Sequence, residues 1–115
     1  MSKFNLIKKW EYENGFYLTS EPSRIGKVLS QFEIFKKISK VEGNIFEFGV
    51  FKGSSLMRIA AFRNILNIDH KIIYGFDIFG KFPKQQIVED NEFIKNFEKK
   101  SGIGISKKDL NKFLK

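Results

Sequence analysis

The sequence predicts an α/β domain with two parallel strands and flanking helices. Two short runs rich in β-forming residues, IFEFGV and KIIYGF, occupy residues 45–50 and 71–76. Between them, apolar side chains recur at helical spacing, at Leu56, Ile59, Ala60 and Leu66. A strand, a helix and a second strand in so short a stretch form a βαβ unit, whose strands run parallel through a right-handed crossover.

Two helices are expected before the first strand. Phe4–Trp10 predicts a short amphipathic helix that Asn14-Gly15 ends. Apolar residues at helical spacing then predict a long helix to about Lys40, with Thr19 or Ser20 as its N-cap and with Pro22 in its first turn. Ser54 or Ser55 is the expected cap of the helix between the strands.

Helices also follow the second strand. Residues 79–90 predict a loop, and residues 91–100 predict a helix that stops at Gly102. Ser106 opens a last short helix with a spacing like that of a capping box. Parallel strands are normally covered by helices on both faces, and a sheet needs more than two strands. We therefore expect the chain to be the opening part of a doubly wound domain, with a small domain that dimerises as the alternative.

Composition and charge exclude several classes of protein. With 42% hydrophobic residues and 14 phenylalanines, the 115 residues predict one folded domain and not a disordered chain. The net charge of +8 comes mostly from lysines on either side of a central region in which basic and acidic residues are equal in number. Only three arginines are present. We expect no nucleic-acid partner and no membrane partner. The absence of cysteine fits a cytoplasmic location.

The turn after the first strand carries the residues that indicate a ligand. A P-loop would end in Gly-Lys-Ser/Thr and a dinucleotide fingerprint would read Gly-x-Gly-x-x-Gly; neither is present. What remains is Glu47 and Gly49 at the end of the strand, Gly53 at the start of the helix, and Asp77 at the end of the second strand. An acidic residue there can accept hydrogen bonds from ribose hydroxyls. The alternative is an ordinary βα turn with an unrelated aspartate.

Three segments of the sequence resemble a known family. They are ENGFYLTS, GNIFEFGVFKGSSLMRIAAFR and KIIYGFDIFGKFP, and the similarity covers about residues 13–110. Together they are similar to the N-terminal half of the macrocin O-methyltransferase-like (TylF-type) family of class I S-adenosylmethionine-dependent methyltransferases. The resemblance implies a Rossmann-like methyltransferase fold with residues 1–42 as a helical lid. Residues 43–115 would then be the first βαβ unit of the cofactor-binding domain, with the helices that follow it, and that domain would be incomplete.

The resemblance also implies roles for individual residues. Glu47, Gly49 and Gly53 would surround the methionine part of S-adenosylmethionine, and Asp77 would accept the ribose hydroxyls. Three further residues would lie near the cofactor, namely Ser54, Ser55 and Phe79. Lid contacts would come from Thr19, Ser20 and Arg24. The resemblance identifies no catalytic residue in this chain. No residue is expected to bind a metal, because the acidic cluster with which the family binds Mg²⁺ is expected only in a full-length form.

The expected function is therefore that of the cofactor-binding half of an O-methyltransferase, which acts on a sugar or a similar small hydroxyl compound. A homo-oligomer is a possible assembly. The alternative is a non-catalytic binding or assembly module with the same βαβ unit. By itself the chain is expected to bind the cofactor feebly and to transfer no methyl group, because ligands of open α/β sheets bind across several strand ends.

Overall fold

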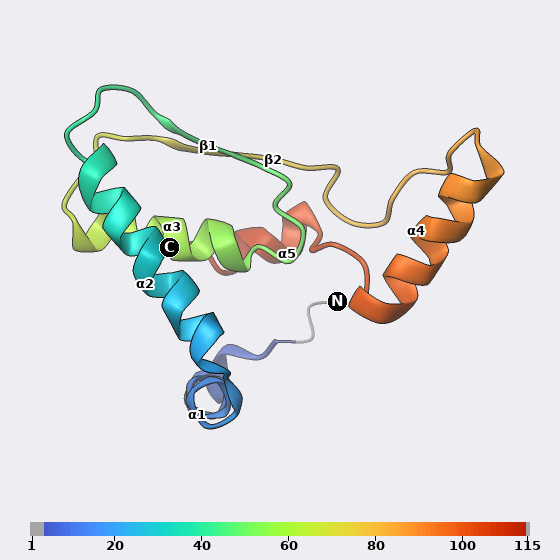
Figure 1. Ribbon diagram of the computed structural model, residues 1–115, viewed down its shortest axis with the longest axis horizontal. Coiled ribbons are helices and arrows are strands. Elements are labelled where there is room, and N and C mark those ends of the chain that lie inside the picture. Colours follow the sequence, from blue (N-terminus) through green and yellow to red (C-terminus); the bar gives the residue numbers. More distant parts are fainter. Residues whose placement is uncertain (1–3, 115) are drawn as a thin grey trace. The chain divides into compact units, whose positions relative to one another are not determined.

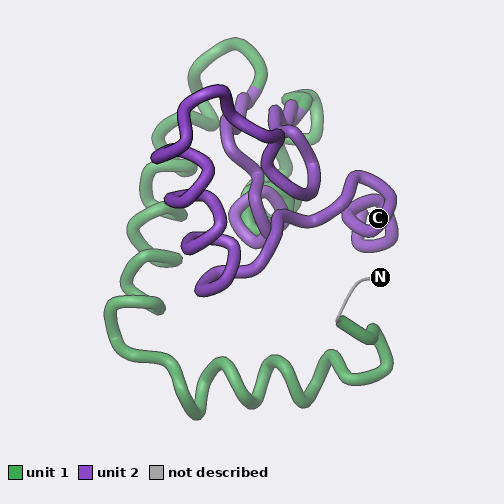
Figure 2. The backbone as a smooth tube through the Cα atoms, turned by 90° about the vertical axis from the view of Figure 1, so that its right-hand side faces the viewer, with its two compact units in different colours: residues 1–44, 58–72 green, residues 45–57, 73–115 purple. Residues whose placement is uncertain are grey.

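The computed structural model describes residues 4–114, which form a mixed α/β structure (Figure 1). The chain forms two compact units, drawn in different colours in Figure 2. Unit 1 consists of Met1–Asn44 and Arg58–Ile72, and unit 2 of Ile45–Met57 and Ile73–Lys115. Within the described residues, no helix combines the length and the apolar character needed to cross a membrane.

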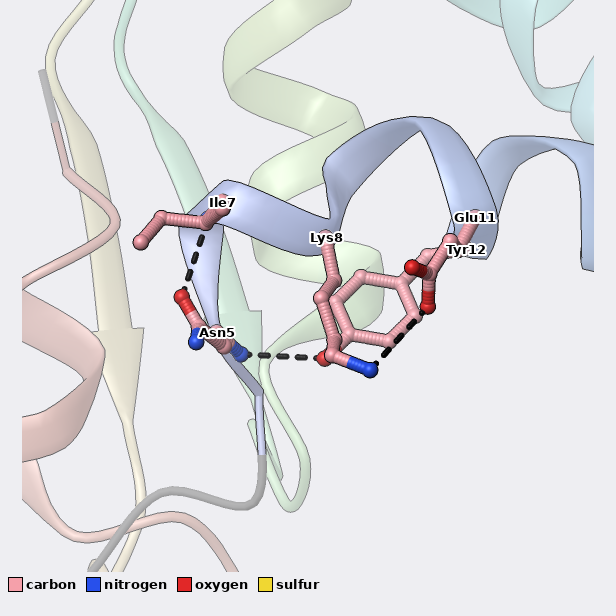
Figure 3. Close-up of polar contacts among 5 residues, drawn as sticks. All are labelled: Asn5, Ile7, Lys8, Glu11 and Tyr12. Carbon is pink, nitrogen blue, oxygen red and sulfur yellow. Dashed lines mark hydrogen bonds and ion pairs between the residues drawn. The ribbon is translucent and has the colours of Figure 1, made fainter.

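Unit 1 begins with a 3-10 helix, η1 (Leu6–Lys8), that leads directly into α1 (Lys9–Thr19). The Asn5 side chain caps η1 by accepting a hydrogen bond from the Ile7 amide at 2.9 Å. The Asn5 amide in turn donates to the Tyr12 hydroxyl at 3.0 Å, which ties the cap of η1 to α1 (Figure 3). The predicted end at Asn14-Gly15 is wrong, because α1 continues through Gly15 to Thr19.

The core of unit 1 lies between α2 (Pro22–Ile38) and the C-terminal part of α3 (Ser54–Ile65). The Phe62 ring lies 5.2 Å from Phe32 and 5.5 Å from Phe35, and both Phe35 and Phe62 are buried. The aromatic residues Phe32 and Phe35 of the long helix are thus part of a core. The helix starts after Glu21 rather than after Thr19 or Ser20, and no side chain caps it.

A buried lysine connects the segment before β2 to the segment before β1. Lys71 is almost completely buried, and its ammonium group donates hydrogen bonds to the carbonyl oxygens of Val41 and Gly43. The Ile72 amide donates to the Asn44 side chain at 3.0 Å. These bonds hold together the two segments that lead into the strands.

Unit 2 contains the sheet, in which β1 (Ile45–Phe48) and β2 (Ile73–Phe76) pair in parallel, with Ile45 opposite Ile73 (Figure 1). The predicted βαβ unit is therefore present, with both strands shorter than expected. The sequence predicted strands covered on both faces. That expectation is wrong, because the side chains of Phe46, Phe48, Tyr74 and Phe76 are exposed on one face.

Two further helices complete unit 2. α4 (Val88–Ser101) starts three residues earlier than predicted and ends at Gly102, as predicted. α5 (Lys107–Asn111) is capped by Ser106, whose hydroxyl accepts a hydrogen bond from the Asp109 amide at 3.1 Å. Leu110 of α5 is buried in a small core with Val50 and Leu56. The core thus lies on the side of the sheet turned toward the first turn of α3.

Candidate functional site

The first strand-end loop, Gly49–Gly53, connects β1 to α3. Its backbone has positive φ angles at Gly49 (86°), Phe51 (49°) and Gly53 (81°). Side chains disfavour this conformation, so glycine at positions 49 and 53 removes most of the strain of the turn. The Gly49 amide donates to the Phe76 carbonyl at 2.8 Å, which extends the strand pairing to the start of the loop.

Asp77 joins this loop to the second strand-end loop, Asp77–Gly80. One carboxylate oxygen accepts a hydrogen bond from the Phe51 amide at 2.8 Å, and the other accepts one from the Phe79 amide at 2.9 Å. The hydrogen bond from Phe51 has the largest effect on the pKa of Asp77; with those from other backbone amides it outweighs partial burial and lowers the pKa below the ordinary value of 3.8. Asp77 is therefore an ionised bridge between the carboxyl ends of both strands.

Glu47 lies on β1, opposite Gly75 of β2, on the face turned toward the core. Its Oε2 atom is shielded from solvent and has no hydrogen-bond partner among residues 4–114. A buried polar atom without a partner is costly and marks a position where a ligand donor or a water molecule is expected. Glu47 thus supplies an unused acceptor next to the first loop.

The first turn of α3, which follows the first strand-end loop, offers hydrogen-bond donors. In the described part of the chain, the amides of Ser54, Ser55 and Leu56 have no hydrogen-bond partner. Such amides, together with the helix dipole, favour a carboxylate or a hydroxyl oxygen.

The surroundings of the two loop glycines differ. A side chain at Gly49 would meet open space, whereas a Cβ at Gly53 would lie 2.8 Å from the Cδ1 atom of Leu110.

Residues 102–105, for which the sequence predicts no role, are hydrogen-bonded to both loops. The Gly104 amide donates to the Gly80 carbonyl at 3.1 Å, and the Ile105 amide donates to the Phe51 carbonyl at 2.6 Å. The Lys52 ammonium donates to the Ile103 carbonyl. A Cβ at Gly104 would lie 3.0 Å from the Gly80 carbonyl oxygen, so this close approach explains the glycine. The Gly-x-Gly pattern of residues 102–104 was the available signal in the sequence.

The structure brings five of the predicted residues together around the strand ends of unit 2, namely Glu47, Gly49, Gly53, Asp77 and Phe79. Phe79 packs its half-buried side chain on the core of Val50, Leu56 and Leu110. Of the two serines, Ser54 is exposed and Ser55 is half-buried.

The predicted lid residues belong to unit 1. Thr19 is the last residue of α1, Ser20 follows it, and Arg24 lies in the first turn of α2. Thr19 donates its hydroxyl hydrogen to the Gly15 carbonyl at 2.6 Å. Their role as a lid stays a prediction.

Among residues 4–114, no group of three histidine, aspartate or glutamate side chains is arranged to hold a metal ion. His70 is exposed in the turn before β2. The strand ends and the loops after them present three kinds of binding group, namely a carboxylate acceptor at Glu47, the free amides of α3 and the ionised Asp77.

Comparison with known proteins does not assign this site to a family. No family model matches the chain, and neither the curated proteins nor the solved structures contain a significant match to it.

Proposed function

We propose that the strand ends of unit 2 form the S-adenosylmethionine site of an O-methyltransferase of the TylF type, with a sugar-like hydroxyl compound as the methyl acceptor. The fold proposed with it is the first part of a doubly wound, Rossmann-like domain. The observation that carries the proposal is the shielded, unpartnered Oε2 atom of Glu47 on β1. The loop that follows β1 has open space at Gly49 and leads into the free amides of α3.

The residues present fit the chemistry of this cofactor. Its methionine part carries an ammonium and a carboxylate. Glu47 would accept hydrogen bonds from the ammonium, and the amides of Ser54 and Ser55 would donate to the carboxylate. Gly49 leaves open space at the start of the loop, which a larger side chain would reduce.

Asp77 would hold the ribose of the cofactor. Each of its oxygens already accepts one backbone hydrogen bond. A carboxylate has about four acceptor positions in total. Two positions therefore remain for the ribose hydroxyls, and the lowered pKa keeps the group ionised and accepting at neutral pH.

The bound cofactor supplies an electrophilic methyl group on its sulfonium sulfur. The contribution of the residues described above is to bind and orient it. We assign no catalytic base among them, and we place the Mg²⁺ ion expected of the family in a longer form of the protein.

The test is a calorimetric titration of the chain with S-adenosylmethionine. We expect weak, saturable binding that Glu47→Gln reduces about tenfold, as for loss of one charge-assisted hydrogen bond. Because Oε2 has no partner in the described residues, this substitution breaks no hydrogen bond of that atom and is expected not to lower the urea midpoint. Glu89→Gln, at an exposed position in the first turn of α4, is the matched control. Equal affinity in all three proteins would contradict the proposal.

A non-catalytic assembly module is the second candidate, and one observation favours it. The crossing segment, Gly102–Ile105, is hydrogen-bonded to both strand-end loops and covers part of the edge at which a ligand would bind. If the chain served assembly alone, the titration would show no saturable heat.

A further inference from the structure

The structure shields the main acceptor of the proposed cofactor site. The Oε2 atom of Glu47 is closed off from solvent, so a ligand reaches it only after neighbouring side chains move. Glu47 is paired with Gly75 of β2, and residues paired in this way point to the same face of the sheet. On that face, a Cβ at Gly75 would lie 3.0 Å from Val50 and 3.3 Å from Leu56. The small core of unit 2 therefore lies beside Glu47, and opening this core would expose the acceptor.

One residue of α5, Leu110, lies at two parts of that site. Its side chain is 4% exposed and packs on Val50 and Leu56. Its Cδ1 atom lies 2.8 Å from the position of a Cβ at Gly53, the residue before the free amides of α3. A displacement of α5 would thus uncover both the core beside Glu47 and the start of α3.

Few contacts hold this C-terminal part of unit 2 in place. Ile105 packs on the same core as Leu110, whereas Ile103 is 50% exposed. Gly102 ends α4 with a φ angle of 73° and provides a hinge, because glycine changes its backbone angles at little cost. Three hydrogen bonds attach residues 102–105 to the strand-end loops, from the Gly104 amide to the Gly80 carbonyl, from the Ile105 amide to the Phe51 carbonyl and from the Lys52 ammonium to the Ile103 carbonyl. A segment with so few buried side chains and bonds can open locally while the rest of the protein stays folded.

We propose that residues 102–111 are an autoinhibitory strap, which keeps S-adenosylmethionine out of the site until it moves away from the loops. The proposal rests on the proposed function, since it assigns a form of regulation to that same site. In the closed state the strap packs on the core beside Glu47 and lies against Gly53. Only the open fraction of the protein binds, so the apparent affinity is reduced by that fraction. A change that loosens the strap therefore strengthens binding.

The first experiment is amide hydrogen exchange of the wild-type chain, followed by nuclear magnetic resonance without and with a saturating concentration of S-adenosylmethionine. The reporters are the amides of Gly104 and Ile105, whose hydrogen bonds to the loops hold the strap closed. We expect the cofactor to accelerate their exchange at least about tenfold, because it binds the open state. The Gly49 amide, which is bonded to the Phe76 carbonyl at the end of the sheet, should not exchange faster.

Two variants loosen the strap and leave the groups assigned to the cofactor in place. Leu110→Ala removes the buried side chain, and Lys52→Met removes the donor to the Ile103 carbonyl at an exposed position. We expect calorimetry to show binding that is at least about tenfold tighter for Leu110→Ala and about fivefold tighter for Lys52→Met. Lys95→Met, at an exposed position on α4, is the matched control and should bind like the wild type. In each loosened variant, the gain in affinity should equal the gain in the exchange rate of the reporters without ligand, since both measure the same opening.

The outcomes separate the strap from the proposed function. Saturable binding that is equally strong or weaker in the two loosened variants would overturn the strap and leave the cofactor site standing. Slower or unchanged exchange of the reporters in the cofactor-bound wild type would do the same, since a lid that closes over the ligand protects its own amides. No saturable heat in any of these proteins would contradict the proposed function, and the strap with it. Circular dichroism confirms that each variant is folded, and the exchange of the wild-type protein needs no variant.

Discussion

Replacement of Asp77 is expected to destabilise the protein even without a ligand. Asp77→Ala removes the acceptors of the Phe51 and Phe79 amides. Both of these residues have positive φ angles, 49° and 55°, which residues other than glycine rarely adopt. A hydrogen bond to a charged group contributes about 1.5–3 kcal/mol. Because water can replace part of each bond at this half-buried site, we expect a total loss of about 2–3 kcal/mol for the two bonds together.

Asp77→Asn is expected to cost about half as much, since one amide oxygen still accepts a hydrogen bond and the side-chain NH₂ faces the second backbone amide. The measurement is urea unfolding at pH 7, followed by circular dichroism, with the free energy extrapolated to water. The order of stability should be wild type, Asp77→Asn, Asp77→Ala.

The stabilising effect of Asp77 also depends on pH. The pKa of Asp77 is lowered in the folded state, chiefly by the Phe51 amide, so protonation favours the unfolded chain. The contribution is complete above the ordinary pKa of 3.8 and is lost as the pH falls through the lower pKa of the folded state. The difference in stability between wild type and Asp77→Asn should therefore shrink below about pH 4.

Asp109 is the control for this dependence, because its pKa is also lowered, by hydrogen bonds from Lys112 and then from Ser106. Asp109→Asn should retain the acid-dependent loss that comes from Asp77. Equal stability of wild type and Asp77→Ala at pH 7, or a difference that persists unchanged into acid, would refute the bridging role of this carboxylate.

Two further predictions concern packing. Phe62→Ala should cost about 3–5 kcal/mol in urea unfolding because the ring is buried between two aromatic rings of α2. Ile65→Ala, at an exposed position of the same helix, should change stability by at most about 0.5 kcal/mol, and similar losses would contradict this core. Gly53→Ala should cost more than Gly49→Ala, because both positions have positive φ but only Gly53 lies against Leu110. Equal unfolding free energies for these two variants would show that Leu110 does not restrict position 53.

The βαβ unit could be predicted from the sequence because its signals are local. The β-forming runs, the helical spacing of Leu56 and Ile59, and the Ser106 cap each depend on a few neighbouring residues. The end of α1 was mispredicted because Gly15 weakens a helix without ending it, and the helix continues to Thr19.

The features that were missed depend on residues far apart in the sequence. The alternation of Phe46 and Phe48 was visible, but whether that face is covered depends on other parts of the structure. The hydrogen bonds from Gly104 and Ile105 to the strand-end loops join residues that no local pattern connects. Asp77 was expected to meet a ribose, and its bonds to two backbone amides could not be foreseen from spacing alone.

The most direct test of the proposed site is a ¹H–¹⁵N correlation spectrum of the chain during a titration with S-adenosylmethionine. This measurement detects weak binding and identifies the amides that are affected. We predict saturable shifts at the amides of Gly49–Leu56 and Asp77–Phe79, the two strand-end loops and the first turn of α3, and smaller shifts at the same ligand concentration in Glu47→Gln. No shifts, or shifts confined to α4, would contradict the claim that the carboxyl ends of β1 and β2 bind this cofactor.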